Sequence, residues 1–187
     1  MKLQVIPTAI PDVKVIVPAR YGDERGFLSE VYERGAFLDA GIDVAFVQEN
    51  HSYSARRGTV RGLHFQVPPR AQAKLVRVAR GAILDVAVDL RPDSPTFGKH
   101  VSVVLSAENW NQLYVPVGFA HGFCTLEPDT EVIYKLSDVY APECERGLLW
   151  NDPALGIDWP VDEATAILSP RDRTHPRLAE LEEMVFA

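Results

Sequence analysis

This sequence of 187 residues lacks several features that mark other classes of protein. Its two cysteines, Cys124 and Cys144, form no CxxC pair and no zinc-type spacing, which indicates two free thiols in a reducing compartment. It contains no run of about 18 apolar residues, so we expect no transmembrane helix. The N-terminal stretch is broken by Pro7 and Pro11 and lacks the long apolar core of a signal peptide. These absences predict a cytoplasmic protein that does not associate with a membrane.

An excess of positive charge is missing as well. The formal net charge of −7 argues against a nucleic-acid-binding protein, which would carry a basic face. An anionic small molecule is still compatible with this charge, because a few clustered arginines can hold one diphosphate. Arg25 and Arg61 each precede a glycine and are candidates for such a site. With 47% hydrophobic residues and no repeat or linker, residues 1–187 are expected to fold as a single domain.

The sequence does contain a series of short strand patterns that are separated by turn residues. Its 14 prolines and 12 glycines are spread along the chain, as in an all-β domain with many turns. Two β-rich runs at 73–79 and 83–90 flank Gly81 and predict a hairpin. Further strands are predicted at 13–17, 100–105, 111–117 and 131–136. Short helices are expected only at 34–40 and 179–185. Closing the strands into a barrel or rolled sandwich would remove exposed edges.

Strand parity places three reactive side chains where they could face an interior. Alternate residues of a strand share a face, so His64 lies on the same side as Gln66. Lys74 is in step with two valines, and Tyr134 is in step with a valine and a leucine. An imidazole is a natural general base, a buried ammonium is costly without a partner or a task, and a phenol can donate a proton. Each residue also has a structural interpretation, as a hydrogen-bonded histidine, a snorkelling lysine or a packing tyrosine.

A carboxylate that accepts a hydrogen bond from His64 would fix the tautomer of the imidazole and raise its basicity. The candidates are Asp172, in a loop-like segment, and Asp85 and Asp89, which follow the predicted hairpin turn. Their spacing in the sequence does not decide between them. His121 lies next to a glycine that allows close approach of the backbone, and it is a candidate for orienting a substrate.

A set of short motifs is spread along the chain in a specific order. They are 23–27 (DERGF), 48–52 (QENHS), 58–66 (GTVRGLHFQ), Lys74, 116–123 (PVGFAHGF), 134–135 (YK), 139–142 (VYAP), 149–153 (LWNDP), 157–160 (IDWP) and 168–172 (LSPRD). Together they resemble the dTDP-4-dehydrorhamnose 3,5-epimerase family over nearly the whole chain. The resemblance implies an all-β, cupin-like jelly-roll β-barrel with a few short helices. It also implies a homodimer and a reaction without a metal or an organic cofactor.

The resemblance further assigns roles to individual residues. It implies that His64 is the catalytic base and that Asp172 supports it. It implies that Lys74 lies near the keto oxygen of the substrate and that Tyr134 is the opposing acid. The residues that match the family's substrate-binding positions are Arg25, Phe27, Glu30, Gln48, Asn50, Arg61, His121 and Tyr140. The implied reaction converts dTDP-4-keto-6-deoxy-D-glucose to dTDP-4-keto-L-rhamnose, a step in the synthesis of rhamnose for cell-surface polysaccharide.

Three alternatives are open at this point. A related enzyme of deoxysugar biosynthesis would epimerise only carbon 3 or carbon 5, or would move a ketone between carbons 3 and 4. A metal-dependent cupin enzyme, such as a dioxygenase, needs several imidazoles or carboxylates at matched spacing. Here Gln66 stands where the second histidine of an HxH pair is expected, and the other histidines are isolated in the sequence. A non-catalytic sugar-binding module would keep the arginines but would not need a histidine, a lysine and a tyrosine in one cavity.

Overall fold

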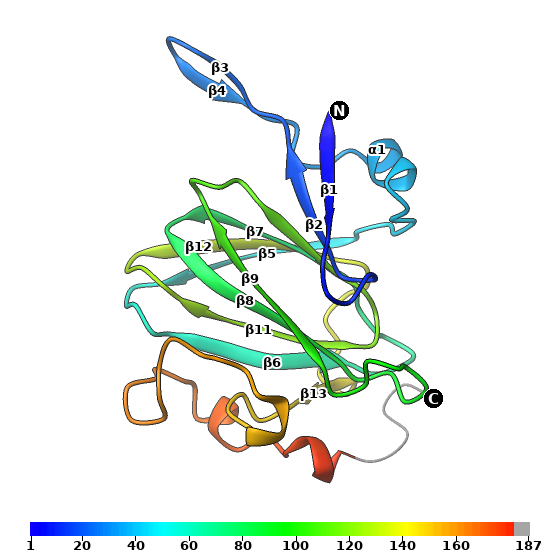
Figure 1. Ribbon diagram of the computed structural model, residues 1–187, viewed down its shortest axis with the longest axis vertical. Helices are drawn as coiled ribbons and strands as arrows, with labels where there is room; N and C mark the ends of the chain where they lie inside the picture. Colours follow the sequence, from blue (N-terminus) through cyan, green and yellow to red (C-terminus); the bar gives the residue numbers. More distant parts are fainter. Residues whose placement is uncertain (182–187) are drawn as a thin grey trace.

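The computed structural model describes residues 1–181, which form two facing sheets of antiparallel strands (Figure 1). The six-stranded sheet contains, in spatial order, β1 (Leu3–Pro7), β2 (Lys14–Pro18), β10 (Gln112–Val115), β7 (Lys74–Arg80), β12 (Thr130–Leu136) and β5 (Gln48–Ser54). The five-stranded sheet contains β13 (Glu145–Gly147), β6 (Val60–Gln66), β11 (Phe119–Thr125), β8 (Ala82–Asp89) and β9 (His100–Ser106). This order confirms the predicted all-β jelly roll, although the two sheets do not close into a complete barrel.

The remaining elements are short. The strands β3 (Tyr21–Asp23) and β4 (Gly26–Leu28) form a hairpin that projects away from both sheets in Figure 1. The predicted helix at 34–40 is confirmed as α1 (Arg34–Asp39), and three 3-10 turns follow later, η1 (Pro153–Leu155), η2 (Arg171–Arg173) and η3 (Leu178–Glu180). Residues 182–185 of the second predicted helix, at 179–185, lie outside the described residues. Within residues 1–181 no helix is long and apolar enough to cross a membrane.

The main core lies between the two sheets, because alternate side chains of each strand point to the same face. Val76 and Val132 of the six-stranded sheet pack there with residues of the five-stranded sheet such as Ile83 and Phe119. Tyr134, on the same face of β12 as Val132, packs against this core. The direction predicted for Tyr134 from strand parity is therefore confirmed.

The predicted hairpin around Gly81 is wrong. β7 pairs with β10 and β12, whereas β8 pairs with β9 and β11 in the other sheet. Gly81 has φ +77°, a left-handed conformation that suits glycine, and it turns the chain from one sheet to the other. A Cβ atom on Gly81 would lie 2.4 Å from Oγ1 of Thr130. Two apolar strands around a glycine look the same in sequence at a hairpin and at a corner between sheets, which explains the error.

The segment 148–181 covers the outer face of the five-stranded sheet and is drawn in orange to red beside β6 in Figure 1. Leu63 and Phe65 of β6 share a cluster with Leu148 and Leu155 of this covering segment. Because these two residues face the covering segment, the intervening His64 points to the other side of the sheet, as strand parity predicted.

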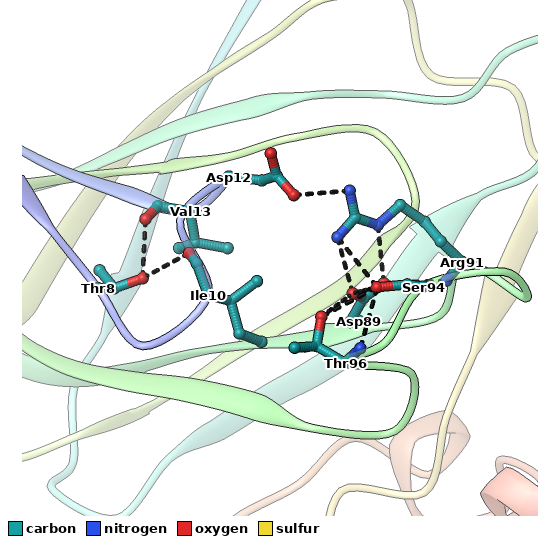
Figure 2. Close-up of polar contacts among 8 residues, drawn as sticks. All are labelled: Thr8, Ile10, Asp12, Val13, Asp89, Arg91, Ser94 and Thr96. Atoms are coloured by element: carbon teal, nitrogen blue, oxygen red, sulfur yellow. Dashed lines mark hydrogen bonds and ion pairs between the residues drawn. The ribbon is translucent and has the colours of Figure 1, made fainter.

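A polar cluster joins the turn between β1 and β2 to the loop after β8 (Figure 2). The buried Asp89 carboxylate accepts hydrogen bonds of 2.6–2.9 Å from one guanidinium and two hydroxyls, those of Arg91, Ser94 and Thr96. Arg91 also pairs with Asp12 of the β1–β2 turn at 2.8 Å. Burial alone would raise the pKa of Asp89, but these hydrogen bonds outweigh it and lower the pKa to about 2. The cluster therefore holds an ionised carboxylate that ties the turn to the loop.

Candidate active site

Two neighbouring pockets, of about 420 and 300 Å³, share three lining side chains. These are His64 from the five-stranded sheet and Lys74 and Tyr134 from adjacent strands of the six-stranded sheet. Pockets of this size suit small organic ligands, whose binding sites have volumes of roughly 300–1,000 Å³. The three residues that strand parity singled out therefore lie at one place, where both sheets contribute.

Asp172, on η2 of the covering segment, holds the imidazole of His64. Their Nε2 and Oδ1 atoms lie 2.6 Å apart, although 108 residues separate them in the chain. The backbone N–H of Asp172 donates to the Ser169 hydroxyl at 3.1 Å, which fixes the turn. Burial would raise the pKa of Asp172, but the imidazoles of His175 and His64 outweigh it and hold that pKa well below its usual range. An ionised Asp172 accepts the Nε2 proton of His64, which leaves Nδ1 able to take up a proton.

Lys74 is buried beside the imidazole. Only 8% of its surface is exposed, and its Nζ donates to the backbone oxygen of His64 at 3.2 Å. Burial lowers the pKa of Lys74 to about 8, although the nearby carboxylates of Asp85 and Glu145 act in the opposite direction. The ammonium is therefore charged at neutral pH. Its charge acts strongly on nearby oxygen atoms because little water surrounds it.

His121 forms a second imidazole–carboxylate pair, with Asp85. The two residues lie on neighbouring strands, and His121 Nε2 is 2.7 Å from Asp85 Oδ1. Burial lowers the pKa of His121, although Asp85 raises it, so the ring favours its neutral form. Asp85 therefore pairs with His121, and Asp89 pairs with Arg91 in the polar cluster of Figure 2. Of the three aspartates proposed from the sequence, Asp172 is the one that pairs with His64.

Tyr134 lies at the end of a chain of hydrogen bonds. Its hydroxyl oxygen accepts from Asn50 Nδ2 at 3.2 Å, and Asn50 Oδ1 accepts from Gln48 Nε2 at 2.9 Å. The backbone N–H of Tyr140 donates to Gln48 Oε1 at 2.9 Å, which anchors the chain. Among residues 1–181 the phenol of Tyr134 accepts from Asn50 but donates its own proton to no other group, so this proton is available to a bound ligand.

Comparison with known proteins identifies the family of this chain. The family described as dTDP-4-dehydrorhamnose 3,5-epimerase matches residues 7–180. The chain belongs to this epimerase family. A relative of that name from Sinorhizobium fredii (strain NBRC 101917 / NGR234) is 54% identical over 173 residues, which cover 92% of this chain and 88% of the relative.

Two solved structures of this epimerase family superpose closely on the chain. The dTDP-4-dehydrorhamnose 3,5-epimerase of Bacillus anthracis, with TDP and PPi bound, has a TM-score of 0.92 at 51% identity and covers 95% of this chain and 100% of its own. The dTDP-6-deoxy-D-glucose-3,5-epimerase of Legionella pneumophila, in complex with dTDP-4-keto-L-rhamnose, has a TM-score of 0.94 at 43% identity. It covers 99% of this chain and 97% of its own.

Five of the eight residues that the epimerase resemblance marks for substrate binding line the two pockets. They are Gln48, Asn50 and Tyr140 in the larger pocket and Arg61 and His121 in the smaller one. Arg61 is held in place by its own contacts, since its guanidinium donates to the Ser54 hydroxyl at 3.2 Å and to the Tyr53 backbone oxygen at 2.9 Å. The structure therefore brings these five expected residues together with His64, Lys74 and Tyr134.

The other three expected residues, Arg25, Phe27 and Glu30, line neither pocket. Arg25 lies on the projecting β3–β4 hairpin with 85% of its side chain exposed, and its guanidinium pairs with Asp23 of the same hairpin. Phe27 is also exposed and packs edge-on against Trp110, with 4.9 Å between ring centroids. Glu30, also exposed, follows the hairpin and lies 3.6 Å from the N-terminal amino group. Within one chain these residues do not reach the cavity.

Glu145 and His175 are among the residues in or beside the site that sequence reasoning missed. Glu145 lines the larger pocket and accepts a hydrogen bond of 2.6 Å from the Tyr140 hydroxyl. His175 Nε2 lies 3.4 Å from Asp172 Oδ1. His175 could have been found from its spacing, because it follows Asp172 by three residues and this spacing brings two side chains to one side of a turn. His64, Asp172 and His175 have ligand atoms within 4.8 Å of one another and could hold a metal ion.

Proposed function

We propose that this protein is a dTDP-4-dehydrorhamnose 3,5-epimerase, which converts dTDP-4-keto-6-deoxy-D-glucose to dTDP-4-keto-L-rhamnose. Its membership of the family supports this reaction, as does the ligand of the Legionella pneumophila relative. The observation that carries the proposal is the convergence of three groups on both pockets. The imidazole of His64, which is hydrogen-bonded to a carboxylate, comes from one sheet. The ammonium of Lys74 and the phenol of Tyr134 come from the other.

The first half of the proposed mechanism removes a proton. The ketone at carbon 4 acidifies the C–H bonds of carbons 3 and 5, and Nδ1 of His64 accepts one of these protons. The electron pair moves onto the keto oxygen, which becomes an enolate. The Lys74 ammonium stabilises that oxyanion, and one preorganised donor of this kind is worth about 3–4 kcal/mol in a dry site. Asp172 stabilises the imidazolium that forms.

The second half returns a proton to the opposite face of the sugar. Tyr134 gives its phenolic proton to the carbanion carbon, which inverts the centre, and exchange with water resets both His64 and Tyr134. A second cycle inverts the other carbon. Protons move and no electrons are gained or lost, so the reaction is balanced without a redox cofactor. Gln48, Asn50, Arg61, His121 and Tyr140 are proposed to position the sugar and the diphosphate.

The proposal includes a homodimer. Arg25, Phe27 and Glu30 match substrate-binding positions of the family, yet they line neither pocket of their own chain and lie on or beside a hairpin that projects away from both sheets (Figure 1). An exposed aromatic ring and an exposed guanidinium at the tip of an arm suit a second protein surface. We place them in the active site of the partner subunit. The chain is further proposed to act as a single domain in the cytoplasm.

The test is deuterium exchange. The purified protein is incubated with dTDP-4-keto-6-deoxy-D-glucose in D2O, and the sugar protons are followed by NMR. Deuterium at carbons 3 and 5, together with a product that a reductase converts to dTDP-rhamnose, is the expected result. Exchange at carbon 3 alone would indicate a monofunctional epimerase or a ketoisomerase. The absence of exchange at both carbons would reject the proposal and favour a binding protein.

Two controls make the result specific to the proposed base. His64→Ala is expected to abolish deuterium exchange. The variant should still bind dTDP, because binding of the nucleotide does not require the imidazole. Treatment with a chelator is expected to leave exchange intact. Activity that requires stoichiometric iron or manganese would instead point to a metal-dependent cupin enzyme.

A further inference from the structure

We propose that His64, Asp172 and His175 form a binding site for a divalent transition-metal ion that stops the reaction when it is occupied. The ion binding stands on the geometry alone, whereas its effect on turnover rests on the proposed function. The three residues offer two imidazole nitrogens and one carboxylate oxygen within 4.8 Å of one another. Asp172 and His175 both lie on the covering segment, so two of the three ligands come from one turn.

His175 is the residue that points to a missing ligand. Its side chain is only 9% exposed, and its Nε2 atom is buried with no well-aligned hydrogen bond among the described residues, although the Asp172 carboxylate lies nearby. This nitrogen faces Asp172 Oδ1 at 3.4 Å. Buried polar atoms are rarely left unpaired, and each exception calls for an explanation. A cation between the imidazoles and the carboxylate would use the lone pair of this nitrogen.

Gly147 shows that the position of His175 is built into the fold. Gly147 lies directly opposite His64, on the neighbouring strand β13. A Cβ atom on Gly147 would lie 2.2 Å from Cε1 of the His175 ring. The φ angle of Gly147 is not in the left-handed region, so the backbone conformation does not require glycine there. The missing side chain instead makes room for an imidazole beside His64.

The set of donor atoms selects the class of ion. Two imidazoles and a carboxylate suit Zn²⁺ and its neighbours, whereas Mg²⁺ and Ca²⁺ prefer ligand sets made of oxygen. Two ligands of a tetrahedral zinc ion lie about 3.3 Å apart, since each bond is about 2.0 Å long. The Asp172–His175 pair already has this spacing, at 3.4 Å. The His64–Asp172 pair, at 2.6 Å, would open by about 0.7 Å to admit the ion.

The residues around the proposed site leave one coordination position of the ion open and determine the charge near it. Both His64 and Asp172 line the smaller pocket, so a fourth position on the ion would face open space that water can fill. Lys74 lines the same pocket and brings a positive charge that opposes the ion. The guanidinium of Arg171 is offset by Glu145 at 2.6 Å. Of the three ligands, Asp172 is the one that offers a carboxylate oxygen.

Occupation of this site would stop the reaction at its base. The ion takes the place of the proton that His64 shares with Asp172. The imidazole then loses the carboxylate that stabilises its charged form, and the metal on Nε2 withdraws electrons from Nδ1. Proton removal from the sugar therefore stops, and a chelator restores it.

The test measures ion binding without substrate. Zn²⁺ is titrated into the metal-free full-length protein in competition with a chromophoric chelator. The wild type is expected to bind one Zn²⁺ per chain. His175→Ala and His175→Gln are each expected to bind it roughly tenfold or more weakly, because one of three protein ligands is lost. His51→Ala is the matched control, since His51 is an exposed imidazole that pairs with Glu131 at 2.9 Å.

The outcomes separate this proposal from the proposed function. Zn²⁺ at a concentration just sufficient to saturate the wild type should stop its deuterium exchange and raise its melting temperature, and at that same concentration His175→Ala should show smaller effects. Equal zinc affinity in the wild type and in both His175 variants would overturn the proposal, as would weaker binding in His51→Ala alone. If zinc binds as expected but the metal-free protein shows no exchange, the metal site stands and the epimerase proposal fails.

Discussion

Two buried side chains beside His64, those of Lys74 and Asp172, have lowered pKa values for different reasons. Lys74 has lost most of its water, which lowers its pKa to about 8. Asp172 is also buried, yet the two imidazoles beside it hold its pKa well below the usual range. At neutral pH both groups are charged. In the mechanism we propose, His64 therefore works between a cation that stabilises the developing oxyanion and an anion that stabilises the imidazolium.

The lysine predicts an alkaline limit to activity. Because the pKa of Lys74 is about 8, the ammonium loses its proton as the pH rises through this value, and the enolate loses its cation. The rate of exchange at carbons 3 and 5 is expected to fall above pH 8. Lys74→Arg keeps a charge that does not titrate in this range. In that variant, whatever its absolute rate, the alkaline limit should disappear from a plot of kcat against pH, and an unchanged limit would contradict the role of Lys74.

The phenol predicts a separation of two rates. In Tyr134→Phe the base still removes a proton, but no acid stands on the opposite face. Formation of the epimerised product is expected to fall by about 10²-fold or more. Wash-in of deuterium to recovered substrate should fall less, since His64 can return an exchanged proton to its own side. NMR of substrate and product in one sample measures both rates, and an equal loss of both would remove Tyr134 from the role of acid.

At the scale of elements, the site depends on the contact between β13 and the covering segment. β13 runs beside β6, and its Gly147 leaves the space that the ring of His175 fills. The covering segment carries both His175 and Asp172 on and after η2. Any change that lifts this turn away from β6 also moves the carboxylate away from His64.

Gly147→Ala is therefore expected to impair turnover from outside the pocket. The added methyl group collides with the His175 ring, which should displace the turn and lengthen the His64–Asp172 contact. Overpacking of this kind costs about 1–3 kcal/mol of stability. We expect a lower melting temperature and a lower kcat with little change in KM. Adding His175→Ala to the same chain removes the collision and should restore both, and failure of this rescue would show that the methyl group acts elsewhere.

A second element contact concerns stability and not chemistry. Arg91 pairs with the buried Asp89 at 2.7 Å and with Asp12 of the β1–β2 turn at 2.8 Å (Figure 2). Arg91→Ala leaves a buried carboxylate without its cation, which costs about 3–5 kcal/mol. Urea unfolding should show this loss, while kcat below the melting temperature stays close to that of the wild type. The matched surface variant Arg146→Ala removes a guanidinium that donates to the backbone oxygens of Glu143 and Glu145, and it should leave the unfolding midpoint nearly unchanged.

The pH dependence of this loss has a definite sign. The pKa of Asp89 is lowered to about 2 in the folded protein, so its stabilising contribution is present above the ordinary pKa of an aspartate and is lost as the pH falls toward 2. The difference in stability between the wild type and Arg91→Ala should therefore shrink in that acidic window. If the difference in stability stayed constant in this pH range, the charge of Asp89 would not be its cause.

These contacts mark the limit of what the sequence could predict. Strand parity predicted the directions of His64 and Tyr134, because a strand repeats every two residues whatever surrounds it. It could not predict that Asp172 pairs with His64, since that depends on the path of the covering segment across the sheet. The turn at Gly81 was misassigned for a related reason. Which sheet receives the next strand is decided by long-range pairing and leaves no local pattern.

At the scale of the whole molecule, the projecting hairpin is the part that the single chain does not explain. It exposes an aromatic ring and a guanidinium, those of Phe27 and Arg25, far from the pockets that the other expected binding residues line. In a symmetric dimer each chain would supply its hairpin to the other, so that each site is built from two chains.

Subunit mixing tests this arrangement. His64→Ala has an intact hairpin but no base, and the double variant Arg25→Ala, Phe27→Ala has an intact base but an altered hairpin. Each protein alone should be nearly inactive. Unfolded together, mixed in equal amounts and refolded, they should recover about a quarter of wild-type activity, because half of the dimers are mixed and each has one complete site. A mixture no more active than its components, or a monomer in light scattering, would exclude a shared site.

The long separation between the base and its carboxylate also has a consequence for synthesis and turnover of the protein. All thirteen strands that the structure describes precede residue 148, so a ribosome makes both sheets before it makes Asp172. A nascent chain therefore contains every one of these strands before it contains the carboxylate that pairs with His64. Cleavage between β13 and η2 that released the later segment would remove Asp172 and would also expose Leu63 and Phe65, which this segment covers. The carboxylate that holds His64 is thus made only after both sheets have been made.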